Sequence, residues 1–164
     1  MANWNEIITD HGPVVVRVAS RILGNAADVE DVTQDVFCQA FQLWEEQTIE
    51  NWPALLRSIA TRRAIDRLRR RQPIVPLPDD LPTDSASPSA DLAEKELAHR
   101  LRVELARLPE HQANVFALRY FEELSNQEIA EALGISTSNV STSLTKARDS
   151  LSHRLADIRC GDAR

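Results

Sequence analysis

The segment from Gln72 to Asp91 limits the fold of this chain more than any other part of the sequence. It contains five of the eight prolines, together with three serines. Because proline fixes φ and has no backbone N–H, a regular helix cannot continue through this stretch. The sequence therefore predicts four segments: a first module at 1–72, a flexible linker at 73–93, a second module at 94–158 and a tail at 159–164.

Both modules are predicted to be all-α, as two small helical domains. Apolar residues recur every three or four positions on each side of the linker, and the chain has only 4 glycines in 164 residues. A break is expected inside the first helical segment at Gly12-Pro13, and a helix end at Gly24-Asn25. The expected helical segments are 7–22 in one or two pieces, 27–46, 53–71, 92–108 and 110–123.

Residues 125–151 have the pattern of a helix-turn-helix. Ser125 and Glu128 are spaced as a capping box, in which each side chain accepts a hydrogen bond from the other residue's backbone N–H. Gly134 follows the first helix where a left-handed turn residue is needed, and Ser136 is suited to cap the second helix. Such a motif places its second helix in the major groove of duplex DNA.

The second helix of this motif has one apolar and one polar face. The apolar positions recur at helical spacing and are predicted to be buried: Val140, Leu144, Ala147 and Leu151. The opposite face supplies eight candidate DNA-contacting residues: Thr137, Ser138, Asn139, Ser141, Thr142, Thr145, Lys146 and Arg148. A helical hairpin used only for packing is the alternative interpretation of the same pattern.

The net charge of −6, taken alone, argues against nucleic-acid binding. The charges are nevertheless arranged in blocks: residues 1–56 carry nine acidic and two basic side chains, whereas residues 57–71 carry seven arginines and one aspartate. Because each phosphate contact releases counterions, the arginines form a second candidate DNA surface: Arg57, Arg62, Arg63, Arg67, Arg69, Arg70 and Arg71. The alternative is a helix end whose charges only keep the protein soluble.

A cluster of acidic side chains is expected on the helix at 27–46. On a helical wheel, the apolar face lies opposite Asp28, Asp31 and Asp35, with Gln34 beside them. Such a face suits a protein partner rich in arginine, and a solvated helix surface has the same pattern. A magnesium-dependent nuclease is a third interpretation, but no partner histidine or nucleophile positions a substrate there.

No cofactor or metal site is expected. Cys38 and Cys160 are far apart, and the chain has no CxxC or cysteine–histidine spacing typical of zinc. The N-terminal residues lack the basic and apolar parts of a signal peptide, and no apolar run approaches the roughly 18 residues of a membrane-spanning helix. We therefore expect a cytoplasmic protein without membrane insertion.

Four segments of the chain resemble signature sequences of the sigma-70 family of bacterial transcription factors. Residues 28–37 (DVEDVTQDVF) resemble the AEDVxQexF motif of region 2.2, and residues 59–71 (IATRRAIDRLRRR) resemble the end of region 2. Residues 105–110 (LARLPE) resemble the entry to region 4, and residues 120–151 resemble its helix-turn-helix. Because the linker leaves no room for region 3, the chain is similar to the extracytoplasmic-function (ECF) group.

The resemblance implies a promoter-specificity subunit of RNA polymerase with no catalytic activity of its own. It assigns one set of residues to the clamp of the core polymerase: Asp28, Asp31, Gln34 and Asp35. It assigns Trp52 and the seven arginines to the −10 promoter element. It assigns the eight polar residues of the helix-turn-helix to the −35 element, and it places the second module on the polymerase flap. An anti-sigma factor that wedges between the two modules is a candidate further partner. The alternative is a helix-turn-helix regulator that binds DNA without polymerase.

Two departures from the family pattern affect the candidate sites. The connection at 47–51 is shorter than the loop with which the family captures a −10 base, and the nearby Trp44 and Trp52 are typical of a core. Ser141 and Ser143 replace two cations of the recognition helix, and hydroxyls discriminate bases less than arginine does. We therefore expect the isolated C-terminal module to bind the −35 element more weakly than the family average.

Overall fold

The structure is a computed structural model that describes residues 3–71 and 90–161. Within these residues there are seven α-helices and no strand, which confirms the expected all-α fold. The helices are α1 (Trp4–Leu23), α2 (Ala26–Glu46), α3 (Trp52–Arg71), α4 (Ala90–Arg107), α5 (Glu110–Tyr120), α6 (Asn126–Leu133) and α7 (Thr137–Gly161). Most of the expected linker lies outside the described residues, and its last residues belong to α4.

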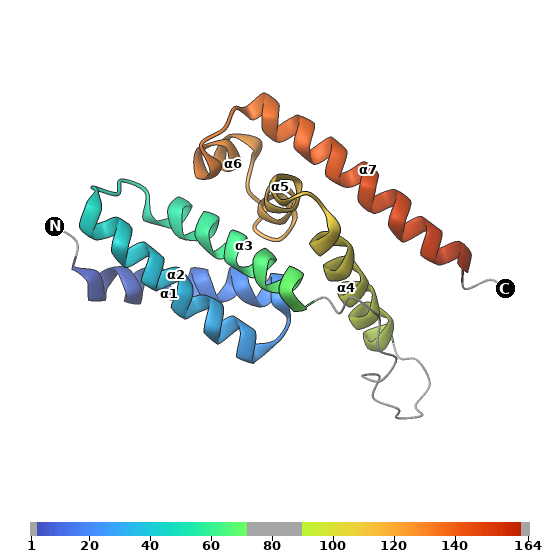
Figure 1. Cartoon of the computed structure of the whole chain (residues 1–164), viewed down its shortest axis with the longest axis horizontal. Helices are drawn as coiled ribbons and strands as arrows, with labels where there is room; N and C mark the ends of the chain where they lie inside the picture. Colours follow the sequence, from blue (N-terminus) through green and yellow to red (C-terminus); the bar gives the residue numbers. More distant parts are fainter. Residues whose placement is uncertain (1–2, 72–89, 162–164) are drawn as a thin grey trace.

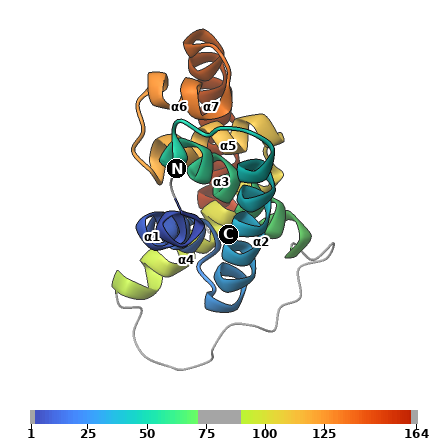
Figure 2. The same cartoon turned by 90° about the vertical axis from the view of Figure 1, so that its left-hand side faces the viewer.

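The helices form two groups that meet along α3. Helices α1, α2 and α3 contact one another, as do α5, α6 and α7 (Figure 1). Helix α3 also contacts α4, α5 and α6. In Figure 2, which looks along α1, the order runs from α1 and α2 through α3 to α6 and α7. The candidate DNA helix α3 therefore lies in the middle of the molecule.

Helix α1 runs without interruption through Gly12 and Pro13, so the expected break there is wrong. Pro13 and Thr9 are exposed, which places the carbonyl that loses its usual donor on the solvent side of the helix. On the other side, Ile7 and Val15 are buried before and after the proline, and the buried stripe continues through Val18 and Ile22. Each buried aliphatic side chain contributes about 1.5–3 kcal/mol, so the stripe as a whole outweighs a proline cost of about 3 kcal/mol.

The turn between α1 and α2 confirms the helix end expected at Gly24-Asn25. Gly24 has φ 65, a left-handed conformation that glycine adopts without a steric penalty. A Cβ at this position would also lie 2.7 Å from Cζ of Arg102, so a larger residue would require the Arg102 guanidinium to shift. The Asn25 side chain accepts the Asp28 N–H over 3.2 Å and caps α2.

Helix α5 ends at Tyr120, not at Glu123 as the sequence predicts. The Leu124 N–H donates to the Leu118 carbonyl over 3.2 Å, and Glu123 has φ 55. A left-handed residue at this place closes the helix in the way a glycine usually does. Leu124 is buried in the core of the helix-turn-helix, and the chain turns early to bring it there.

One hydrophobic core extends through both groups of helices. It draws residues from α1, α2, α3, α4, α5 and α7, among them Val15, Leu56, Leu105, Phe116 and Leu151. A second, smaller core lies among α5, α6 and α7. The two modules that the sequence places on either side of a linker therefore share apolar contacts in the folded chain.

Candidate functional site

Helices α6 and α7 form the helix-turn-helix with the predicted caps in place. The Ser125 hydroxyl oxygen accepts the Glu128 N–H over 3.2 Å, and the Glu128 carboxylate accepts the Ser125 N–H over 2.7 Å. The hydrogen bonds with Ser125, first that from its backbone, lower the pKa of Glu128, and the Arg57 charge adds to this. Gly134 has φ 64, and the Ser136 hydroxyl accepts a backbone N–H of the first turn of α7. The motif predicted from sequence is confirmed.

Helix α7 buries one face and presents the other, as predicted. The four apolar residues of the stripe are all buried: Val140, Leu144, Ala147 and Leu151. The eight candidate DNA-contacting residues, from Thr137 to Arg148, are all exposed. Ser143 differs from them, because it is buried and its hydroxyl lies 3.3 Å from Asn139 Oδ1.

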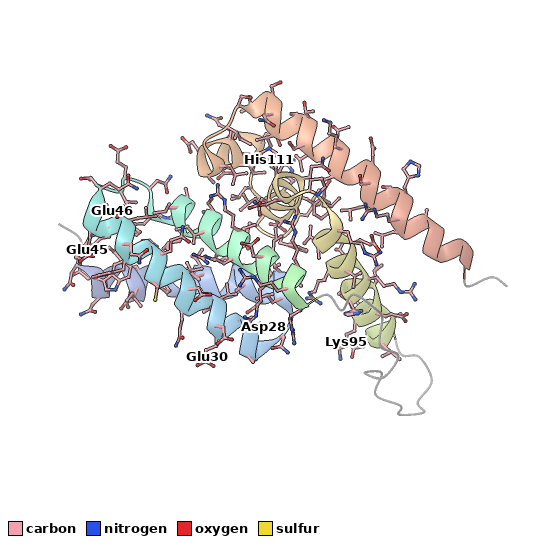
Figure 3. The ribbon with its side chains drawn as sticks, viewed as in Figure 1. Asp28, Glu30, Glu45, Glu46, Lys95 and His111 are labelled. Atoms are coloured by element: carbon pink, nitrogen blue, oxygen red, sulfur yellow. The ribbon has the colours of Figure 1, made fainter. Side chains whose placement is uncertain are left out.

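Part of the polar face of α7 is already hydrogen-bonded within the protein. Thr142 and Thr145 donate to carbonyls one turn earlier in the helix, each over 3.0 Å. Asn139 Oδ1 lies 3.2 Å from Nε2 of His111, which Figure 3 labels beside α7. Lys146 and Arg148 are exposed and form no ion pair in the described part of the chain, so they are the cations that this face can offer to a phosphate.

The arginine cluster of α3 is largely engaged by the protein itself. Arg67 lies 3.1 Å from the Asp28 carboxylate and 3.0 Å from that of Asp31, and Arg71 lies 2.6 Å from Asp28. The Asp28 side chain is only 7% exposed, so its expected position on an open acidic face is wrong (Figure 3). It lies against α3, because two guanidinium groups offset the cost of burying its charge.

Two further arginines of α3 contact the C-terminal helix group. Arg57 lies 3.8 Å from the carboxylate of Glu122. Arg69 donates to the Leu108 carbonyl over 2.7 Å and also to a carbonyl of α4. These two positions are separated by about 18 Å along α3, at 1.5 Å per residue. The second module is thus held at both ends of the candidate DNA helix.

The other three arginines of the cluster are exposed. Arg63 donates to Gln39 Oε1 on α2 over 2.9 and 3.1 Å. Arg62 and Arg70 make no hydrogen bond or ion pair with any described residue. In this conformation, these three side chains are therefore the ones most available to a nucleic acid.

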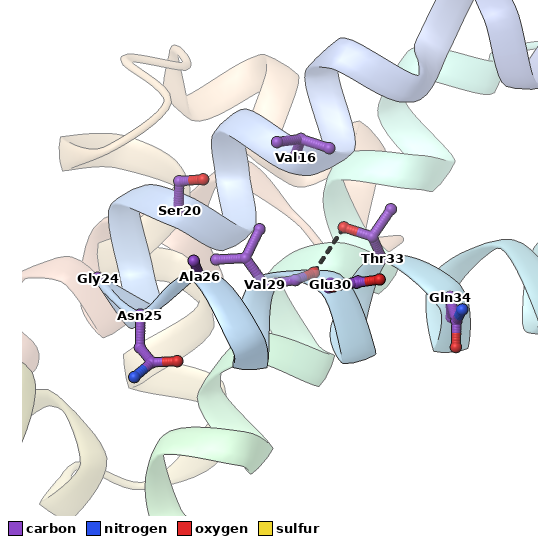
Figure 4. Close-up of a pocket in the computed structure, with 9 residues that line it drawn as sticks. All are labelled: Val16, Ser20, Gly24, Asn25, Ala26, Val29, Glu30, Thr33 and Gln34. Carbon is purple, nitrogen blue, oxygen red and sulfur yellow. Dashed lines mark hydrogen bonds between the residues drawn. The ribbon is translucent and has the colours of Figure 1, made fainter.

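The structure contains an apolar groove that the sequence does not predict. It has a volume of about 640 Å³ and lies between α1 and α2 beside their connecting turn (Figure 4). Its lining consists of Val16, Ser20, Gly24, Asn25, Ala26, Val29, Glu30, Thr33 and Gln34. The exposed Asp31 and Asp35 stand on the same helix as this lining. The sequence contained one sign of this groove, because the apolar Val16 falls outside the buried stripe of α1. In the structure, Val16 is 44% exposed.

Trp52 belongs to an aromatic cluster that includes Trp44, near the C-terminal end of α2. Figure 3 labels Glu45 and Glu46 at that end of the helix. Its ring centroid lies 6.2 Å from that of Trp4, which in turn lies 5.0 Å from Phe41 and 5.8 Å from Trp44. Trp52 is half-buried and packs against the main core. Trp44 is 36% exposed, so this cluster keeps an open edge.

The described residues meet the requirements of neither a metal site nor a membrane-spanning helix. Among residues 3–71 and 90–161, no group of three or more histidine, cysteine, aspartate or glutamate side chains is arranged to hold a metal ion. None of the helices described there combines the length and apolar character needed to cross a bilayer.

These features define a helix-turn-helix protein with a second helical module that carries an arginine-rich helix. Residues 7–74 match the family described as Sigma-70 region 2, and residues 98–151 match Sigma-70, region 4. The chain is 31% identical over 144 residues to the RNA polymerase sigma factor SigV of Bacillus subtilis, which covers 85% of this chain and 83% of SigV. The chain belongs to the sigma-70 family and, within it, to the ECF group.

Two further comparisons agree with this assignment. The chain is 32% identical over 164 residues to the ECF RNA polymerase sigma factor SigE of Mycolicibacterium smegmatis, which covers 95% of this chain and 63% of SigE. It is 26% identical over 166 residues to the ECF RNA polymerase sigma factor SigW of Bacillus subtilis, covering 93% of this chain and 89% of SigW.

Solved structures show the same fold. CnrH, in complex with the cytosolic domain of CnrY, superposes with a TM-score of 0.63 at 22% identity, over 94% of this chain and 88% of CnrH. The extracytoplasmic function sigma factor SigJ of Mycobacterium tuberculosis superposes with a TM-score of 0.50 at 26% identity, over 84% of this chain and 49% of SigJ.

Proposed function

We propose that the chain binds core RNA polymerase and directs it to promoters, with α3 at the −10 element and α7 at the −35 element. The observation that carries this proposal is the presence of an arginine-rich helix and an exposed helix-turn-helix face in one chain, in the order of regions 2 and 4. Such a protein needs no catalytic group, because the polymerase supplies the chemistry, and it acts in the cytoplasm with the polymerase.

The proposed polymerase-binding surface is the exposed part of α2 together with the groove beside it. Asp31, Gln34 and Asp35 supply polar and acidic groups, and Val16 and Val29 supply apolar area. An amphipathic partner helix that carries arginine matches both properties. Asp28 has an indirect role in this proposal, since it holds two arginines of α3 in place.

The proposed −10 contacts come first from the exposed arginines Arg62, Arg63 and Arg70. Phosphate contacts of this kind supply salt-dependent affinity and fix the register of the DNA. The remaining arginines of the cluster must exchange an intramolecular partner for a phosphate before they contribute. Trp52, with the open edge of its aromatic cluster, is the proposed stacking surface for a −10 base.

The proposed −35 contacts come from the polar face of α7. Lys146 and Arg148 suit phosphate oxygens, and the hydroxyls of Ser138 and Ser141 suit base edges or phosphates. Since this face carries only two cations, its affinity for duplex DNA is low and promoter binding depends on the polymerase.

An anti-sigma factor is a further proposed partner. CnrH, which has a similar fold, is described in complex with the cytosolic domain of CnrY. A partner of this kind on the present chain would cover the groove between α1 and α2 and so compete with the polymerase.

The test is run-off transcription with core polymerase on a promoter library, with and without this chain. We expect promoter-dependent transcripts only when both are present. Asp35→Arg should abolish them by reversing the charge of the polymerase-binding face. Glu94→Arg makes the same charge change at an exposed position of α4, outside every proposed binding surface, and should leave transcription intact. Specific DNA binding without any transcript would instead identify a regulator that acts without polymerase.

A further inference from the structure

Glu122 is a buried carboxylate at the junction of the two modules. It stands in the turn after α5, and its side chain is only 1% exposed. Three arginines of the N-terminal module surround it: Arg17 at 2.9 Å, Arg21 at 3.2 Å and Arg57 at 3.8 Å. A single acidic side chain thus connects the second module to both α1 and α3.

The turn that carries Glu122 holds its carboxylate in a defined position. Glu123 takes the left-handed conformation, and the Leu124 N–H donates to the Leu118 carbonyl. Arg119 donates to the Leu124 carbonyl over 2.9 Å, and Arg21 also donates to the backbone carbonyl of Phe121. The backbone of the loop is therefore braced from both modules, and this fixes the position from which the Glu122 side chain reaches the arginines.

Other contacts across the same boundary also use arginine donors. Arg102 of α4 donates to the Ile22 carbonyl over 3.0 Å at the C-terminus of α1, where a cation is favoured. Arg69 donates to the Leu108 carbonyl, as described above. Guanidinium groups prefer phosphate and carboxylate oxygens, so the same donors that close the molecule are suited to a nucleic acid.

We propose that Glu122 is an electrostatic latch that keeps the free protein closed and competes with DNA phosphates for Arg57. In the closed form, the second module occupies Arg57 and Arg69 at both ends of α3. Opening the molecule releases these two arginines, and DNA then takes the place of Glu122. The role of DNA in this inference rests on the proposed function, whereas the closed state of the free chain does not.

The test measures the distance between the modules in the free, full-length chain. A donor dye on Cys38 of α2 and an acceptor on α7, through Asp149→Cys in a Cys160→Ser background, report that distance by energy transfer. We expect Glu122→Gln to lower the transfer efficiency, because a neutral amide no longer balances three arginines in a buried site. Glu123→Gln, the same charge change on the exposed neighbouring residue, should leave the efficiency unchanged.

The second readout is the affinity of the free chain for a non-specific duplex, measured by fluorescence anisotropy at physiological salt. Glu122→Gln should raise it by on the order of tenfold, because apparent affinity scales with the fraction of molecules that are binding-competent. The double variant Arg17→Gln with Arg21→Gln should also open the molecule and raise DNA affinity, although it removes two positive charges. A general charge effect would change the affinity of this variant in the opposite direction.

Three outcomes would overturn the latch: unchanged energy transfer in a folded Glu122→Gln chain, opening without a gain in DNA affinity, or an equal effect of Glu123→Gln. If Glu122→Gln fails to fold, as judged by circular dichroism, the double arginine variant decides alone. If run-off transcription fails although Glu122→Gln still opens the molecule, the proposed function is contradicted and the latch is not.

Discussion

The arginine face of α3 and the polar face of α7 were both expected to contact DNA, but the protein uses them differently. On α3, four of the seven arginines are bound to Asp28, Asp31, Glu122 or backbone carbonyls of the second module. On α7, all eight candidate residues are exposed, and their contacts are mostly with their own helix. A charged face read from sequence shows which groups can bind an anion, but only the fold shows which are already bound.

The largest expected effect concerns the ion pairs that arginines of α3 form with Asp28 inside the protein. Asp28→Ala should lower the free energy of unfolding by about 2–3 kcal/mol, less than for a fully buried pair, because Arg67 and Arg71 are partly exposed. Urea unfolding measures this change. Asp31→Ala, which removes a mostly exposed partner of the same Arg67, should cost about 0.5 kcal/mol or less. Equal losses for the two variants would contradict the buried role of Asp28.

The next effect concerns the exposed arginines. Arg62→Ala with Arg70→Ala should weaken binding to duplex DNA about tenfold and reduce the salt slope of affinity by about 2, since two phosphate contacts are lost. Arg67→Ala with Arg71→Ala removes the same charge and should weaken DNA binding less, while it destabilises the fold. A salt titration of affinity for the two double variants, followed by urea unfolding, checks this order.

A smaller effect concerns the scaffold beneath α7. Ser125→Ala should lower the free energy of unfolding by about 1 kcal/mol, because it removes the cap of α6. The folded state lowers the pKa of Glu128, so the contribution of its carboxylate is complete above the pKa of glutamate in the unfolded chain. That contribution disappears as the pH falls through the lower pKa of the folded state. Ser125→Ala keeps the backbone N–H, which is the larger cause of the lowered pKa, and loses only the hydroxyl. Unfolding measured across acidic pH should therefore show a slightly weaker pH dependence in Ser125→Ala than in the native chain.

The smallest effect concerns the turn between α5 and α6, which contains Glu123. Glu123→Gly should raise the free energy of unfolding by about 0.5–1 kcal/mol, because glycine adopts a positive φ without the steric cost that a side chain carries. Thermal unfolding measures the gain. Gln127→Gly, at an exposed position inside α6, should instead lower stability by about 1 kcal/mol. A loss of stability for both would show that the side chain of Glu123 makes a contribution of its own.

The candidate sites differ in how far the sequence could predict them. The helix-turn-helix was predicted residue by residue, because the box of Ser125 and Glu128, the turn at Gly134 and the buried stripe of α7 all depend on neighbours within a few positions. Asp28 was misplaced because a helical wheel shows the angle of a side chain on its helix but not the helix that packs above it. The groove beside Val16 was missed for the same reason, since it needs both α1 and α2 in their final positions.

The sequence by itself determined the all-α fold, the positions of most helix ends, the helix-turn-helix and the membership of the sigma-70 family. Local hydrogen bonds and hydrophobic periodicity specify these features, and both can be read along the chain. The tertiary structure alone decided that α1 continues through Pro13, that α5 stops at Tyr120 and that Glu122 meets three arginines from distant segments. Those outcomes depend on burial and on charge pairs between residues more than a hundred positions apart, and no local pattern encodes them.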